Sequence, residues 1–129
     1  MAERESTPPR QQLRREGEEL LWVAFGAVPG ALLRWQVGGS LADQNVVVNV
    51  LGAALLGWLA GQPAAPRRQL LLGIGFCGSL TTFSSWMLDA VQLMSAGQAG
   101  AAVGLIGVTL GLGFGAGCMG WFLGQRFQR

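Results

Sequence analysis

Apolar residues along the chain fall into four long stretches separated by short polar segments. The stretches cover residues 20–38, 45–61, 69–94 and 99–124. A helix needs about 20 predominantly apolar residues, each rising ~1.5 Å, to cross a membrane. The pattern therefore predicts four membrane-spanning helices joined by short connections, which makes neighbouring helices antiparallel.

The distribution of charge excludes a water-soluble helical domain. Only 12% of the residues are charged, and the segments 46–66, 69–88 and 90–125 carry no charge at all. Helices on the surface of a soluble domain need a polar face, which these segments cannot provide. We therefore expect an all-α integral membrane protein that crosses the cell (inner or plasma) membrane several times.

The two ends of the chain are polar. Residues 1–19 contain four Arg, five Glu and two adjacent prolines, and lack the short apolar core of a signal peptide. We interpret them as a solvated cytoplasmic tail. The predicted organisation is this tail at 1–19, a four-helix transmembrane domain at 20–124 and a C-terminal tail at 125–129.

Glycines mark two special segments. The centre of the third stretch, residues 73–82, has three glycines and two threonines. Each glycine lowers helix propensity by ~1 kcal/mol relative to alanine, so we expect this helix to be broken. The fourth stretch has nine glycines. Their small-xxx-small spacing favours close helix packing inside a bundle.

Composition argues against several functions. A net charge of +2 is too small to indicate nucleic-acid binding, and no histidine is present to act as a general base. Cys77 and Cys118 lie within apolar stretches, where a thiol behaves as a small hydrophobic group. We therefore expect neither an enzyme nor a nucleic-acid partner.

Polar side chains inside the predicted helices are the candidate functional groups, because hydrocarbon penalises unpaired polar atoms. Asn45 and Asn49 are one helical turn apart and share a face. Asn49 is the stronger signal, because an amide cannot satisfy itself on its own helix as Ser and Thr do. Arg34 has three interpretations: attraction of an anion, a structural role, or extension of its charge to the membrane surface.

Three motifs resemble the small fluoride channels known as Fluc or CrcB. They are GALLRW at 30–35, VNVLG at 48–52 and GFCGSLTTFS at 75–84, and the match extends over about residues 26–120. The resemblance implies an antiparallel dimer with two fluoride pores, passive export of cytoplasmic fluoride that reduces its toxicity, and a structural sodium ion at the dimer centre that is not transported.

The chemistry of the side chains agrees with a fluoride pore. Fluoride is tightly hydrated, so a pore must replace its water with donors that do not trap it. The Asn49 amide and the hydroxyls of Ser84 and Thr109 are such donors, and the ring edge of Phe83 also attracts anions. The complete set of candidate pore residues is Asn49, Phe83, Trp86, Ser84, Thr109, Asn45 and Arg34. By the family motif, the backbone carbonyls of Gly78 and Thr81 bind the sodium ion.

Several positions depart from the family pattern. The largest is Trp86, which stands where a second phenylalanine is usual and could narrow the pore. The others are Ser79 for glycine, Trp35 for tyrosine, Asn45 for threonine, Leu105 for tyrosine and Asp89 for glutamate.

Two other functions are alternatives. A small dual-topology drug–proton antiporter needs a carboxylate within the first helix, and the apolar stretch 20–38 has none. A non-conducting assembly subunit would explain the glycines but not Asn49, Thr81 and Phe83 together.

The arginines predict one orientation. Eight of them lie on the side of both termini and only Arg34 could reach the other, so we expect cytoplasmic termini. The second subunit of the dimer is either a copy of this chain or an oppositely oriented paralogue.

Overall fold

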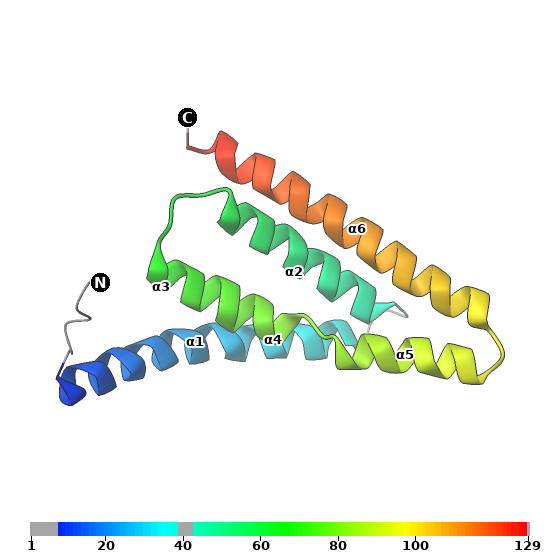
Figure 1. The fold of residues 1–129 in the computed structure, drawn as a ribbon, viewed down its shortest axis with the longest axis horizontal. Helices are drawn as coiled ribbons and strands as arrows, with labels where there is room; N and C mark the ends of the chain where they lie inside the picture. Colours follow the sequence, from blue (N-terminus) through cyan, green and yellow to red (C-terminus); the bar gives the residue numbers. More distant parts are fainter. Residues whose placement is uncertain (1–7, 39–42, 129) are drawn as a thin grey trace, which may run out of the picture.

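The computed structural model describes residues 8–38 and 43–128, which form helices and short connections (Figure 1). The predicted loop at Gly39 and Ser40 lies outside these residues. The elements in chain order are α1 (Pro9–Gly38), α2 (Gln44–Ala60), α3 (Pro66–Arg68), η1 (Gln69–Cys77), α4 (Gly78–Leu80), α5 (Ser84–Ser95) and α6 (Ala99–Arg126). Because α3, η1, α4 and α5 follow one another as a single crossing, the chain forms four antiparallel crossings.

The crossings have the length and composition that a membrane requires. Residues Pro9–Gly38, Pro66–Ser95 and Ala99–Arg126 are each long and apolar enough to span a bilayer. The second crossing, α2, is a shorter apolar helix of 17 residues, or ~25 Å. The prediction of an all-α, multi-pass membrane protein is confirmed.

Two helix pairs form the body of the molecule. α2 packs along α6, and α1 packs along η1 and α4, while α5 crosses the first part of α6 (Figure 1). Glycines allow the close approach: a Cβ atom at Gly57 would overlap the Gly117 carbonyl, and one at Gly120 would overlap the Ala54 carbonyl. Van der Waals contact between backbones therefore holds α2 to α6.

The third crossing is broken as predicted, but the break is shorter than the glycine-containing segment 73–82 suggests. The helical pattern stops only at Thr81–Phe83, after α4 and before α5. Gly73 and Gly75 lie inside η1, which is a π-helix. Gly75 is needed for packing, because a Cβ there would overlap the Val23 carbonyl of α1.

The N-terminal tail is helical where the structure describes it. α1 begins at Pro9, a residue suited to the first helical position, and continues without interruption into the apolar stretch. Residues 9–19 are almost all exposed, which agrees with a solvated segment. Once the apolar part is helical, each further residue adds one hydrogen bond, so the helix extends into the tail.

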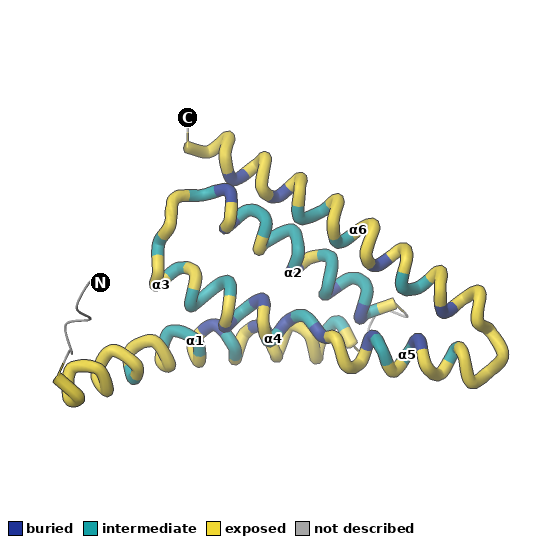
Figure 2. Tube along the Cα trace, viewed as in Figure 1, coloured by how far each residue is buried: buried dark blue, intermediate teal, exposed yellow. Residues whose placement is uncertain are grey.

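Burial is confined to the lines where helices face each other, and the outer surfaces are exposed (Figure 2). The exposed surfaces carry large apolar side chains such as Phe25, Phe114 and Phe122, as expected for a protein surrounded by lipid.

Packing within the described chain accounts for only some of the α6 glycines. Six of the nine have no atom near the position of a Cβ: Gly100, Gly104, Gly107, Gly111, Gly113 and Gly115.

The two kinds of glycine predict different mutational effects. We expect Gly120→Ala to lower the free energy of unfolding by about 1–3 kcal/mol, because the added methyl group overlaps the α2 backbone. Gly17→Ala, where nothing lies nearby, serves as the control and should leave stability unchanged or slightly higher. Thermal unfolding in detergent micelles measures both. Equal stability of the two variants would contradict the proposed packing of α2 on α6.

Candidate functional site

Asn49 of α2 lies against the break in the third crossing. Its Nδ2 donates a hydrogen bond to the Thr82 carbonyl (2.9 Å), and its Oδ1 accepts one from the Thr82 N–H (2.8 Å). The side-chain amide thus replaces the helical hydrogen bonds that Thr82 has lost. Non-helical backbone within a membrane requires such partners. Asn49 retains a second Nδ2 proton beyond these two bonds.

The other polar groups at the break are satisfied locally or from α1. The Thr82 Oγ1 accepts a hydrogen bond from the Ser85 N–H (3.3 Å), and the Thr81 hydroxyl donates to the Cys77 carbonyl (2.8 Å). Arg34 donates from Nη1 to the Thr81 carbonyl (3.3 Å). Within the described part of the chain, no side chain or backbone N–H donates to the Gly78 carbonyl.

An open groove of about 440 Å³ runs beside the break, and we call it the break groove. Its floor is the pairing of Asn49 with Thr82, and its wall includes the rings of Phe83 and Trp86. These rings are in an edge-to-face arrangement, with centroids 5.8 Å apart. Phe83 is 72% exposed, whereas Trp86 is 6% exposed. The residues lining the groove are Asn49, Ala53, Leu56, Thr81, Thr82, Phe83, Trp86, Thr109, Leu110, Gly113 and Phe114.

Trp86 connects α5 to α6. Its indole N–H donates to the Thr109 Oγ1 (3.0 Å), and the Thr109 hydroxyl donates in turn to the Leu105 carbonyl (2.7 Å). Trp86 and Thr109 are both buried. The Thr109 hydroxyl proton is therefore bound to a carbonyl of its own helix. From the sequence we expect this hydroxyl to donate to an anion, and in this arrangement it does not.

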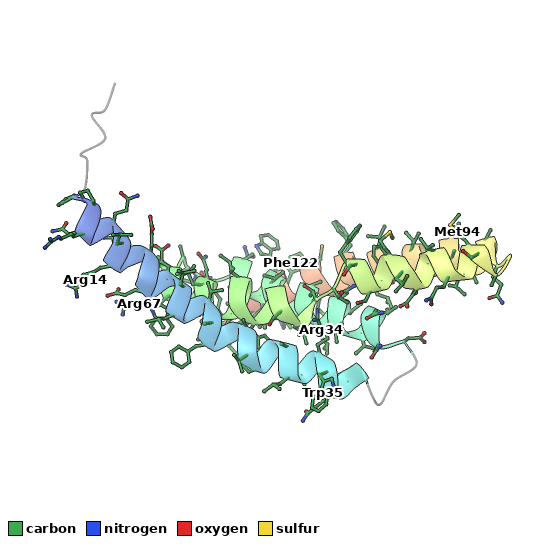
Figure 3. All side chains as sticks on the ribbon, turned by 90° about the horizontal axis from the view of Figure 1, so that it is seen from below. Arg14, Arg34, Trp35, Arg67, Met94 and Phe122 are labelled. Atoms are coloured by element: carbon green, nitrogen blue, oxygen red, sulfur yellow. The ribbon has the colours of Figure 1, made fainter. Side chains whose placement is uncertain are left out.

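Arg34 and Asn45 line a second hollow, of about 720 Å³, between α1 and α2. Asn45 donates from Nδ2 to the Asp89 Oδ2 (2.6 Å), which joins α2 to α5. Figure 3 shows Arg34 on the side of α1 that faces the other helices, with Trp35 pointing away from them. Arg34 therefore points to the break and not along α1 to the membrane surface.

The structure brings together most of the predicted site residues but not all. Asn49, Phe83, Trp86 and Thr109 meet in the break groove, next to Thr81. Asn45 and Arg34 lie in the second hollow. Ser84 is exposed at the start of α5 and lines neither.

Two residues that line the break groove are not among the predicted pore residues. Thr82 is central, since its backbone binds Asn49 and its hydroxyl caps the second half of the crossing. Its position directly after Thr81 at the break is a signal that could have identified it. Phe114 of α6 lines the groove and is 78% exposed, but nothing in its apolar surroundings distinguishes it from a lipid-facing residue.

Comparison with known families decides what kind of protein this is. Residues 21–121 match the model of a family described as CrcB-like protein, Camphor Resistance (CrcB). The chain belongs to the CrcB/FluC family. A CrcB/FluC relative from Synechococcus sp. (strain CC9902), named fluoride-specific ion channel FluC 2, is 69% identical over 92% of this chain and 89% of its own.

Further CrcB/FluC relatives cover a similar part of the chain. A FluC 2 channel from Parasynechococcus marenigrum (strain WH8102) is 70% identical over 90% of this chain and 88% of its own. A FluC 1 channel from Prochlorococcus marinus is 42% identical over 85% of each. The resemblance found in the sequence is confirmed, and a family of ion channels agrees with the prediction that the chain is not an enzyme.

The Trp86–Thr109 bond predicts a coupling between α5 and α6. We expect Trp86→Phe to lower the free energy of unfolding by about 1 kcal/mol, because it removes a buried hydrogen bond. Thr109→Val removes the other partner, so the double variant should lose less than the sum of the two single losses. A double-mutant cycle by thermal unfolding in detergent measures this coupling. Additive losses would show that the bond contributes nothing.

Proposed function

We propose that this chain forms a fluoride-specific channel that exports cytoplasmic fluoride passively and so reduces fluoride toxicity. The observation that carries the proposal is the break groove, in which the Asn49 amide and the Phe83 ring lie together at an interrupted helix. The names of relatives at 69% and 70% identity support the choice of ion.

The groove offers donors without a charge that would trap the anion. Within it, the second Nδ2 proton of Asn49 and the ring edge of Phe83 provide partial positive charge. The first N–H groups of α5 add the positive end of a helix dipole, close to Ser84. None of the residues lining the groove is charged. Such a surface replaces water around fluoride and still lets the ion leave.

The channel is proposed to be an antiparallel dimer. The groove is open along one side, where Phe83 and Phe114 are both largely exposed, so one protomer does not enclose a path. A Cβ atom at Gly78 would meet nothing, and the same holds for six glycines of α6. Small residues that pack against nothing in the described part of the chain suit the close approach of a second subunit.

The break also fits a structural sodium ion. Sodium is a hard cation that favours oxygen ligands, and interrupted helices supply them as backbone carbonyls. The Gly78 carbonyl makes no hydrogen bond to the described residues, and Thr81 is in an extended conformation that ends the α4 helix. Two carbonyls from each of two subunits would surround the ion. Bound there, it would neutralise the carbonyl dipoles at the subunit contact and would not be transported.

The antiporter alternative lacks the group it requires. Asp89 is the membrane-embedded carboxylate of the described chain, and it lies on α5, where its Oδ2 accepts a 2.6 Å hydrogen bond from Asn45 of α2. The apolar part of α1 contains no acid. A non-conducting subunit would not need the donors that converge in the break groove.

The proposed path predicts a strong effect of two substitutions. A hydrogen bond to an ion contributes about 1.5–3 kcal/mol, so Asn49→Ala should reduce fluoride efflux by roughly tenfold or more. Phe83→Ile removes the polar ring edge and should have a comparable effect. Efflux from proteoliposomes, followed with a fluoride electrode, measures both variants.

The matched control is Phe122→Ile, an exposed α6 residue outside the groove, which should conduct as the unmodified chain does. Size-exclusion chromatography checks that every variant keeps its assembly. Unchanged efflux in Asn49→Ala and Phe83→Ile would remove these residues from the path.

The second subunit is proposed to be an oppositely oriented paralogue. Figure 3 shows Arg14 and Arg67 at one end of the molecule and Met94 at the other, as a single membrane orientation requires. Arg126 ends α6, whose last turn contains no other basic residue. An excess of arginine on one side directs that side to the cytoplasm.

Expression of the chain alone tests this pairing. Single cysteines introduced at Ala64 and at Gln98, in a background without Cys77 and Cys118, report the two membrane faces. We expect only the Gln98 variant to react with an external impermeant thiol reagent, and we expect no fluoride efflux until an oppositely oriented partner is added. A chain that conducts alone and is found in both orientations would instead establish a homodimer.

A further inference from the structure

Arg34 lies next to one of the two carbonyls proposed to bind sodium. Its Nη1 donates to the Thr81 carbonyl oxygen at 3.3 Å, across 47 residues of sequence. It is the charged residue of α1 that lies within the apolar stretch, and it reaches the break from the hollow between α1 and α2. A cation at Thr81 would therefore have a guanidinium bound to the same oxygen atom.

Charge repulsion decides how these two groups affect each other. A carbonyl oxygen has two lone pairs, so sharing it is geometrically possible. Two positive charges a few ångströms apart in a low dielectric repel each other strongly. One long hydrogen bond from Arg34 contributes less than this repulsion, so its net effect on a bound cation is unfavourable.

We propose that Arg34 competes with sodium for the Thr81 carbonyl. The guanidinium would thereby set the sodium concentration at which the site is half occupied. The inference rests on the sodium site of the proposed function. In a single protomer, Arg34 satisfies the Thr81 carbonyl and so stabilises the break before a second subunit is present.

Sodium-dependent thermal stability tests the inference without measuring transport. Purified protein is titrated with sodium against N-methyl-D-glucamine at constant ionic strength, and the melting temperature is recorded. We expect the sodium concentration for half-maximal stabilisation to fall roughly tenfold in Arg34→Gln, because one positive charge near the site is removed. Arg34→Met is a second neutral variant and should behave in the same way.

Two further variants separate charge from shape. Arg34→Lys keeps the positive charge and should respond to sodium as the unmodified chain does. Arg10→Gln removes an equal charge from the exposed start of α1 and should have no effect. Unchanged or weaker sodium binding in both neutral variants overturns the role of Arg34. Absence of any sodium response in the unmodified chain and all variants overturns the sodium site itself and the inference with it, while fluoride efflux tests the channel independently.

Discussion

Backbone groups at Thr81–Phe83 lose their helical hydrogen bonds inside a membrane-spanning segment, and the organisation around them follows from this constraint. Asn49 satisfies both the N–H and the carbonyl of Thr82. A side-chain amide offers a donor and an acceptor on two separate atoms, so it can bind both groups at once. These two bonds fix the orientation of the Asn49 side chain, so its second Nδ2 proton has a defined direction. Asn49 therefore stabilises the break and, in the proposed channel, also serves as a hydrogen-bond donor to the ion.

The same break separates two kinds of electrostatic surface. α4 ends in carbonyls at Gly78 and Thr81, while α5 begins with N–H groups near Ser84. Helix ends carry partial charges of opposite sign, so the first half of the crossing favours a cation and the second half an anion. In the proposed channel, one interruption would provide for a structural cation and a conducted anion without a carboxylate among the residues that line the break groove.

The sequence predicts the fold and part of the site, for identifiable reasons. The four crossings follow from long apolar stretches, and the break follows from its glycines and threonines, although Gly75 serves packing against α1. Asn49 stands out because an amide is costly in lipid. Hydrogen bonds between distant residues could not be predicted, since Arg34 and Thr81 are 47 residues apart. The use of the Thr109 proton within its own helix depends on a rotamer that sequence does not specify.

Within this one chain the structure explains all the departures from the family pattern except Trp35, which is 77% exposed. Asn45 and Asp89, both unusual, form a hydrogen bond with each other. The Ser79 hydroxyl binds the Phe76 carbonyl and faces Gly30 of α1, which has no side chain to obstruct it. Trp86 is held by Thr109, one turn from the unusual Leu105. These positions need no standard residue from a partner, so the proposal of an oppositely oriented paralogue depends on the arginine distribution, a property of membrane insertion and not of the pore.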